Sequence, residues 1–309
     1  MKKQLLFPAL LAGLCLLLAA CSAGSRGQIP PPAADAPLSL AEDETPSYLS
    51  CRIVDGAEDG QLLLAALDGC LSGGHESSFN DGLGVFRLSA EDIPVYLDGQ
   101  PAAAADLQDG MPVEIAFNGI LLETFPMQLG QAYSVSAYSI GQEQNPGGSY
   151  YDLCGLYLQV LDDLWTTDPG LNEDISIAGL DLSQAPGGLL ESEKAALAWR
   201  FGELHGVEIV TGTFEELRDQ GYFSSSISAP TPAEGEEPPA GVYQWEDGCL
   251  FTISPSGGHE DETYSLPTLF FDAEKWRSPL GAYFFADSSC VWPEAGTWSG
   301  YTVKWEAIS

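Results

Sequence analysis

The chain has 309 residues and a formal net charge of −34 at pH 7, because 45 acidic residues oppose 11 lysines and arginines. This balance excludes the basic surface that nucleic-acid phosphates require, and it disfavours binding to an anionic membrane through a polybasic patch. It fits a solvated exterior domain, for which plain solubility is the simpler interpretation and cationic surroundings are the other. The length beyond Pro46 suggests two ordinary domains.

Residues 1–21 have the parts of a secretory signal. Lys2 and Lys3 precede an apolar run over 5–20, which ends in small residues. The run has about sixteen residues, fewer than the roughly 20 that a helix needs to span a bilayer core. The segment therefore predicts export of the chain.

The signal ends in Leu18-Ala19-Ala20-Cys21, which resembles a bacterial lipobox. The resemblance implies that Cys21 is diacylated and becomes the mature N-terminus. Two acyl chains make such an anchor stable, since each buried methylene contributes about 0.8 kcal/mol and one chain binds only marginally. The alternatives are an ordinary signal, or a membrane helix in which Cys21 falls by chance. The lipobox predicts a lipid-anchored protein of the cell membrane that faces the exterior.

The stretch 22–46 contains five prolines and few large apolar residues, so it cannot bury a core. We predict a disordered, extended tether, which at this length reaches at most roughly 80 Å. Everything functional is then expected to lie outside the membrane, beyond the tether.

Five cysteines remain after the signal and the lipobox are set aside: Cys51, Cys70, Cys154, Cys249 and Cys290. They form no Cys-x-x-Cys pair, and their number is odd, which fits neither a disulfide framework nor a zinc site. Single cysteines within apolar segments are usually small buried hydrophobic residues. We predict buried thiols, and one bridge of unknown pairing stays open.

The region 47–140 shows short apolar strands separated by turn residues, with one helical turn near 102–107. Five or six such strands predict an all-β, OB-like barrel. The clearest local signal is Asn118-Gly119 between the apolar stretches 113–117 and 120–125. Because Asn-Gly favours the two positive φ angles of a type I′ turn, this pattern predicts a hairpin.

The run from Asp106 to Gln128 includes Gly110-Met111-Pro112-Val113 and Glu123-Thr124-Phe125-Pro126. It resembles an uncharacterised OB-like domain of small Gram-positive lipoproteins. The resemblance implies an extracytoplasmic barrel and transfers no catalytic residue. Barrels that bind nucleic acid need a positive groove, whereas Arg52 and Arg87 are the only basic residues in 47–140.

We predict a linker over 141–149 and a second domain over 150–309. Apolar periodicity predicts helices over 153–165 and 191–204, and a capping box at Thr213 predicts a short third helix. A mobile loop is expected near 223–241. Four strands are then expected over the ranges 249–254, 268–272, 282–286 and 301–308. Helices followed by strands predict an α+β domain, with helices packed on an antiparallel sheet.

The stretch Glu191–Tyr222 and the one from Phe270 onward resemble an uncharacterised domain of clostridial-type lipoproteins. This resemblance implies a fold and no chemistry.

No motif of a serine hydrolase, zinc protease, P-loop or dinucleotide site occurs. The pentapeptide Ser-Gly-Gly-His-Glu occurs twice, around His75 and His259. A weak divalent-cation site is one interpretation, and chance similarity of two glycine-rich loops is the stronger one. His205 is expected to cap a helix end.

Two further groups of residues are weak candidates for chemistry. The carboxylates at Asp162-Asp163, Asp168 and Glu215-Glu216 would suit acid/base work if two of them met in a cleft, yet so acidic a chain contains such pairs anyway. The tryptophans of the C-terminal half would stack on sugars or peptides, or else pack in the core, which is the heavier interpretation. They are Trp245, Trp276, Trp292, Trp298 and Trp305.

The leading hypothesis is a binding or interaction module without catalysis, cofactor or metal, whose partner is a cell-wall polymer, a peptide or a protein, and not nucleic acid. The alternative is an extracytoplasmic hydrolase of wall or glycan material that uses carboxylates.

Replacing Cys21 by Ala removes the only acylation point of the lipobox. We expect Cys21→Ala to move the protein from the membrane fraction to the soluble fraction in cell fractionation, because two acyl chains are lost. Cys15→Ala, within the signal, is the matched control and should stay with the membrane. Retention of Cys21→Ala on membranes would refute the anchor.

Overall fold

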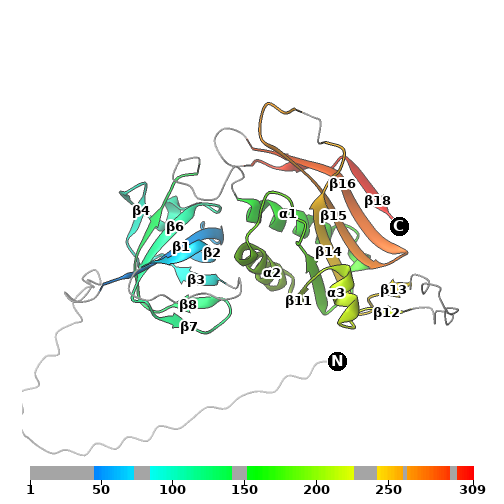
Figure 1. Ribbon diagram of the computed structural model, residues 1–309, viewed down its shortest axis with the longest axis horizontal. Coiled ribbons are helices and arrows are strands. Elements are labelled where there is room, and N and C mark those ends of the chain that lie inside the picture. The colour runs from blue at the N-terminus through cyan, green and yellow to red at the C-terminus, as the bar shows by residue number, and fades with distance from the viewer. Residues whose placement is uncertain (1–44, 73–83, 141–151, 226–241, 260–262, 293–297) are drawn as a thin grey trace, which may run out of the picture. The chain divides into compact units, whose positions relative to one another are not determined.

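The computed structural model describes residues 45–72, 84–140, 152–225, 242–259, 263–292 and 298–309. Residues 39–309 form one compact unit. Two large sheets and three α-helices make up most of the described residues (Figure 1). All but the last two residues of the predicted tether, the linker at 141–149 and most of the loop near 223–241 lie outside them. The division into two domains therefore stays a prediction.

The first sheet contains nine strands in the order β5-β4-β9-β6-β1-β2-β3-β8-β7. Their bounds are β1 (Ser47–Asp55), β2 (Gln61–Ser72), β3 (Val85–Ser89), β4 (Val95–Leu97), β5 (Gln100–Ala102), β6 (Pro112–Phe117), β7 (Leu121–Leu122), β8 (Met127–Leu129) and β9 (Ala132–Ala137). The predicted helical turn is the 3-10 helix Ala104–Asp106. One face of the sheet buries an apolar cluster that includes Leu49, Phe86 and Phe117.

The prediction of an OB-like barrel followed by an α+β domain with an antiparallel sheet is wrong. Among the described residues, no pairing joins β5 to β7, so the first sheet has two ends and does not close. The predicted hairpin at Asn118-Gly119 is also absent, since β6 pairs with β1 and β9 while β7 pairs with β8. A type I′ turn needs two positive φ angles, and of this pair only Gly119 has one, at 76°.

The second sheet has the order β11-β10-β14-β15-β16-β17, with β18 also paired to β16. Its strands are β10 (Ile177–Asp181), β11 (Glu208–Thr211), β14 (Gly248–Pro255), β15 (Thr268–Ser278), β16 (Gly281–Val291), β17 (Tyr301–Thr302) and β18 (Trp305–Ile308). A small separate sheet joins β12 (Ser224–Ser225) to β13 (Tyr243–Gln244). The three helices are α1 (Leu153–Thr166), α2 (Glu191–His205) and α3 (Phe214–Asp219), close to their predicted bounds.

This sheet is mixed, which is the second reason that the α+β prediction fails. Strand β10 runs parallel to both β11 and β14, whereas β14, β15 and β16 pair antiparallel. A strand that returns parallel to its neighbour needs a crossover connection, and α2 provides the crossover between β10 and β11.

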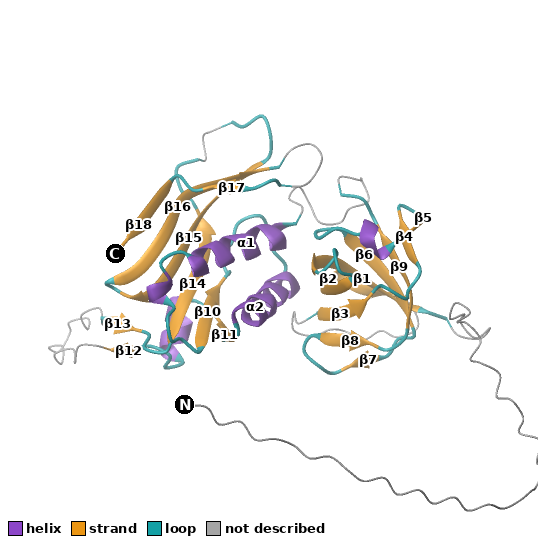
Figure 2. Ribbon diagram, turned by 180° about the vertical axis from the view of Figure 1, so that it is seen from behind, coloured by secondary structure: helices purple, strands orange, loops and turns teal. Residues whose placement is uncertain are grey.

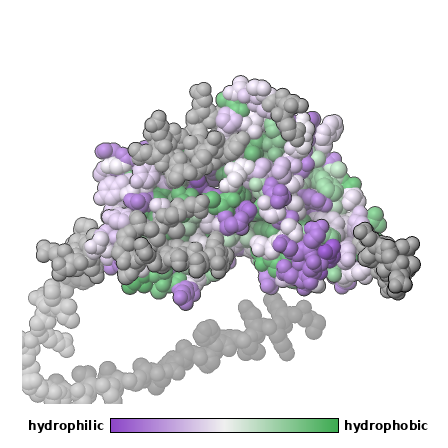
Figure 3. All heavy atoms as spheres, in the orientation of Figure 1, coloured by the Kyte–Doolittle hydropathy of each residue, from purple (hydrophilic) through white to green (hydrophobic). Residues whose placement is uncertain are grey.

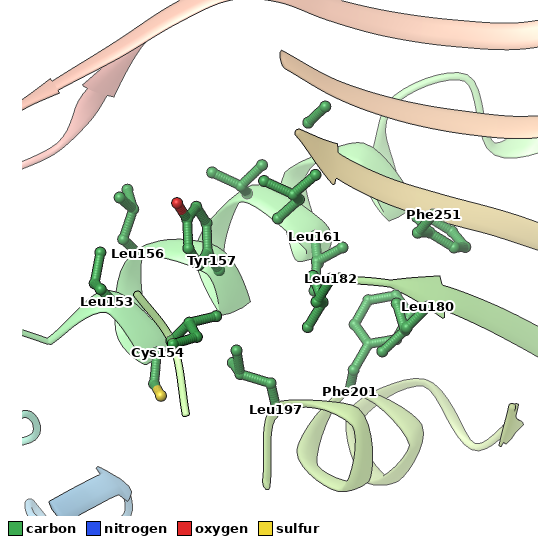
Figure 4. Packing of buried hydrophobic residues seen from close by; sticks show 14 of the residues in the cluster. Leu153, Cys154, Leu156, Tyr157, Leu161, Leu180, Leu182, Leu197, Phe201 and Phe251 are labelled. Atoms are coloured by element: carbon green, nitrogen blue, oxygen red, sulfur yellow. The ribbon is translucent and has the colours of Figure 1, made fainter. Parts of the chain in front are cut away.

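Successive residues of β10 pack into different apolar clusters. Ala178 and Leu180 lie in the cluster that contains the buried face of α1 and α2. Figure 4 shows Leu180 and Leu182 among the side chains of both helices, beside Phe251 of β14. Ile177 packs instead with Val210 and α3 in a separate cluster. Because successive side chains of a strand point to opposite faces, α2 and α3 cover opposite faces of the sheet.

Helix α2 contacts β2 and β3 of the first sheet as well as β11 of the second. Both views of the ribbon show α1 and α2 between the strands of the two sheets (Figures 1 and 2). The large apolar cluster accordingly joins Leu63 and Val85 of the first sheet to the two helices.

A buried ion pair fixes the first turn of α2 against β1. Arg52 Nε lies 2.7 Å from Glu193 Oε1, and both side chains are almost fully buried. Arg52 also donates to the carbonyl of Gly110 at 3.0 Å. The other Glu193 oxygen accepts from the backbone N–H of Leu190 at 2.8 Å, which satisfies a free donor at the start of the helix.

Among the described residues, no helix has the length and apolar character that a bilayer crossing requires.

Removing one partner of the buried pair leaves the other as an uncompensated buried charge. We expect Arg52→Met to lower the free energy of unfolding by about 3–5 kcal/mol. The double variant Arg52→Met/Glu193→Gln should lose less, because Gln is uncharged and still accepts from Leu190. Urea unfolding followed by circular dichroism measures both. Lys194→Met, which breaks an exposed pair with Glu191, is the control and should change stability by less than about 1 kcal/mol. A loss of less than about 1 kcal/mol for Arg52→Met as well would contradict a stabilising role of the buried Arg52–Glu193 pair.

The buried carboxyl of Asp152 makes the free energy of unfolding depend on pH. Its carboxylate accepts from Gly155 N at 3.0 Å and from Trp298 Nε1 at 3.1 Å, and burial raises its pKa to about 7. An unfolded Asp ionises near pH ~4, so between about pH 4 and 7 the folded chain binds the extra proton. The contribution of Asp152 to stability is therefore present below that range and is lost as the pH rises to about 7.

Asp152→Asn keeps an acceptor and cannot ionise. We expect its free energy of unfolding, relative to the parent, to rise by on the order of 2 kcal/mol between pH 5 and pH 8. Urea titrations at the two pH values measure this difference, with the exposed Asp92→Asn as control. Parallel pH profiles for Asp152→Asn and the parent would contradict the buried, protonated carboxyl.

Candidate functional site

Strands β10 and β11 are parallel, so their carboxyl ends lie side by side, and the connections that follow them go to opposite faces of the second sheet. The chain leaves β10 towards α2 on one face, and it leaves β11 towards α3 on the other. Adjacent parallel strands whose connections go to opposite faces leave a crevice at their carboxyl ends, where ligands bind in open sheets. A cavity of about 1240 Å³ opens at this place. We call it the switch-point crevice.

Three segments of the second half of the chain line the switch-point crevice. The end of β10 and the residues after it contribute the run 180–183, and α2 contributes one face from Glu191 to Glu203. Strand β11 and the residues on either side of it contribute Gly206, Val207, Ile209 and the run 211–213. Phe125, from the connection between β7 and β8, completes the lining. The apolar part of the lining includes Leu180, Leu182, Ala195, Ala198, Val207 and Ile209.

The charges of the switch-point crevice are mainly negative. Asp181, Glu191, Glu203 and Glu216 line it, and Lys194 is the one basic residue among the lining residues. The Lys194 ammonium already binds Glu191 at 2.8 Å. Figure 3 shows hydrophilic side chains gathered over α3. The first turn of this helix carries Glu215 and Glu216, and Glu216 also lines the crevice. An anionic ligand such as a phosphate is therefore disfavoured here.

Most of these carboxylates accept hydrogen bonds from residues close to them in the sequence. Asp181 Oδ1 accepts from the N–H of Ser183 at 3.0 Å and from its hydroxyl at 2.6 Å. Glu216 Oε2 accepts from Thr213 N at 2.8 Å in the capping box of α3. Glu203 is exposed near the C-terminal end of α2. The arrangement presents fixed negative charge and does not present a matched acid and base.

Two aromatic side chains border the switch-point crevice. Trp199 is half-buried on α2, and the Arg87 guanidinium of β3 lies 5.1 Å from the centre of its ring. Phe125 is exposed over 53% of its surface, so its ring is open to a ligand. The lining includes no histidine or cysteine. Apolar walls with a few placed polar groups are typical of binding sites.

The sequence-predicted residues lie elsewhere, apart from Glu216. Cys21 and His75 fall outside the described residues. His259 Nε2 lies 2.5 Å from Asp287 Oδ1, and the ring stacks on Phe270 with centroids 3.8 Å apart. The residues 260–262 that complete the acidic loop are not described, so the cation interpretation stays untested.

His205 ends α2, as predicted. Its ring stacks on Trp165 with centroids 4.2 Å apart, and burial lowers its pKa. Its Nε2 lies 3.4 Å from Asp162, whereas the neighbouring Asp163 accepts from the hydroxyl of Tyr301. Asp163 thus has a structural partner of its own, whereas the buried His205 Nε2 makes no hydrogen bond within the described residues.

Four of the predicted buried thiols are confirmed, at Cys51, Cys154, Cys249 and Cys290. Burial raises the pKa of Cys249 and of Cys290 to about 12, so both stay protonated and unreactive near neutral pH. The fifth cysteine, Cys70, lies in β2 where the side chains are not described.

The tryptophans divide between core and surface. Trp245 and Trp292 are buried, which confirms the core interpretation for them, and Trp276 packs against the cluster around α3. Trp305 on β18 is 64% exposed, contrary to that interpretation.

Sequence reasoning missed the switch-point crevice because its members are far apart in the chain. The signal that could have found it is the order strand, helix, strand over 177–211, which is the pattern of a parallel crossover. The apolar periodicity predicted the helix over 191–204 within this stretch, whereas all four expected strands of the sheet lay after it.

The described residues include no group of three or more His, Cys, Asp and Glu side chains placed to hold a metal ion. The chain matches no protein-family model, no curated protein and no solved structure. The resemblances to lipoprotein domains and to a lipobox stay predictions.

Proposed function

We propose that the protein is a membrane-anchored, extracytoplasmic lipoprotein that acts as a binding module, and that the switch-point crevice is its ligand site. The observation that supports the site is the cavity of about 1240 Å³ at the carboxyl ends of two parallel strands. The anchor and the exterior location are supported by the signal, the lipobox at Cys21 and the proline-rich stretch after it.

The size of the switch-point crevice favours a ligand larger than a metabolite. Pockets for small molecules usually have volumes of roughly 300–1,000 Å³. This cavity is larger, at about 1240 Å³, and it runs from the end of β10 along α2 to β11. A segment of a wall polymer, a peptide or a protein partner fits such a site.

Binding is better supported than hydrolysis. A carboxylate hydrolase needs an acid and a base, or a nucleophile, that are free to reach the substrate. Asp181 and Glu216 are instead bonded to the turns that they stabilise, and Glu191 is paired with Lys194. The acidic lining thus selects the charge of a ligand.

Filling the switch-point crevice should abolish binding. Ala195 is half-buried on the α2 wall, and Trp at this position would occupy the space beside it. Residues 39–309, immobilised on beads, are incubated with surface extract of the producing cell, and retained material is quantified by mass spectrometry.

We expect Ala195→Trp to retain at least tenfold less of the parent's ligand. Leu280→Trp is the matched control, because Leu280 is 89% exposed in the turn between β15 and β16. Circular dichroism should show both variants folded. Equal capture by Ala195→Trp and the parent would contradict the proposed site.

A further inference from the structure

Strand β11 is an edge strand, and its free edge lies in the switch-point crevice. Among the described residues its only strand partner is β10. Glu208 N donates to Ser176 O at 3.0 Å, and Gly212 N donates to Leu180 O at 3.2 Å. In a parallel pair, alternate residues direct both backbone groups to the same neighbour. The N–H and C=O groups of Ile209 and Thr211 therefore point away from β10.

These same two residues line the switch-point crevice. The cavity thus contains a short row of backbone donors and acceptors that no described strand occupies. Such an edge is a template for a further strand, and proteins that recognise extended peptides use it in this way.

The lining face of α2 combines small residues with the larger Glu191, Lys194, Trp199 and Glu203. Ala195, Ala198 and Gly202 lie on this side. The approach is closest at Gly202, where an added Cβ would lie 2.8 Å from Cγ1 of Ile209. A ligand strand along β11 would place alternate side chains against this face of α2, where both apolar and acidic side chains line the cavity.

The charge of the lining decides between possible occupants. Four carboxylates face the cavity, and its one lysine is already paired. A second copy of the chain also carries a net charge of −34, and repulsion between the two copies opposes self-association through β11. An acidic edge of this kind prevents pairing with acidic chains and attracts basic ones.

We infer that β11 binds an extended, basic peptide segment, which adds to the second sheet as a further strand within the switch-point crevice. This inference rests on the proposed function of the crevice as the ligand site, and it assigns the ligand's class and its mode of binding.

The probe is the capped peptide acetyl-(Lys-Val)3-amide, titrated into the full chain in a non-ionic detergent and followed by isothermal calorimetry. We expect saturable binding that weakens at least tenfold between 50 mM and 300 mM NaCl, because exposed charges are screened. The matched peptide with Glu in place of Lys should not bind.

Two N-methylated versions of the peptide test strand addition. One carries N-methyl groups on the Lys amides, and the other carries them on the Val amides. Only one set of amides can face β11, since alternate residues of a strand point their N–H groups to opposite sides. We expect one version to bind at least tenfold more weakly and the other to bind as the parent peptide does.

Variants of the protein test the edge itself. Thr211→Pro removes an outward N–H and leaves the bonds to β10 in place, as proline does on edge strands. We expect Thr211→Pro to weaken peptide binding at least tenfold, and the control Thr211→Val to change it less than threefold. Glu203→Gln should weaken binding of the Lys peptide and reduce its salt dependence.

Equal binding of both N-methylated peptides would overturn strand addition, and it would leave the crevice as ligand site if Ala195→Trp still blocks capture. If the peptide does not bind, but Ala195→Trp still loses capture of another surface ligand, the inference is overturned and the proposed function is kept.

Two further outcomes concern the place of binding. Unchanged peptide binding by Ala195→Trp would overturn the inference, because the peptide would then lie outside the crevice. Concentration-dependent dimers that disappear in Thr211→Pro would overturn it in favour of a second copy.

Discussion

The buried pair of Arg52 and Glu193 is the interaction on which the position of α2 depends. A charge in a protein interior is tolerated only when it is paired and its remaining hydrogen-bonding groups are satisfied. Here the guanidinium binds Glu193 and the carbonyl of Gly110, while the carboxylate also binds the N–H of Leu190. The first turn of α2 is thereby fixed to β1. Since the same helix forms a wall of the switch-point crevice, the pair connects the first sheet to the site.

The switch-point crevice in turn follows from the topology of the second sheet. The connection after β10 goes to α2 on one face, and the connection after β11 goes to α3 on the other, so neither helix covers the strand ends. The binding that we propose for this crevice needs no catalytic motif. The excess of acidic residues then gives the cavity its charge, and β11 adds backbone groups that pair with no other described strand.

Local patterns predict the helices well and the strand pairing poorly. The apolar periodicity predicts the bounds of α1 and α2 to within one residue, and the capping box at Thr213 predicts the start of α3. Pairing is not local, so nothing in the sequence near β10 states that it pairs with β14, some seventy residues further on. Asn118-Gly119 fails as a hairpin for a local reason: the Asn118 side chain accepts from Ile120 and Gln131 N–H groups instead. Asp181, Trp199 and Thr211 could not be grouped from the sequence because only the crossover brings them to one cavity.

Hydrogen–deuterium exchange of the full chain, with and without the Lys-Val peptide, tests the central claim most directly. The account predicts that the amides of Ile209 and Thr211 exchange rapidly in the free protein, because they point away from β10, and become protected when the peptide is bound. Protection should be confined to β11 and the neighbouring face of α2, with β18 at the other side of the sheet unchanged. Protection of β18, or exchange at β11 that the peptide does not alter, would contradict the account.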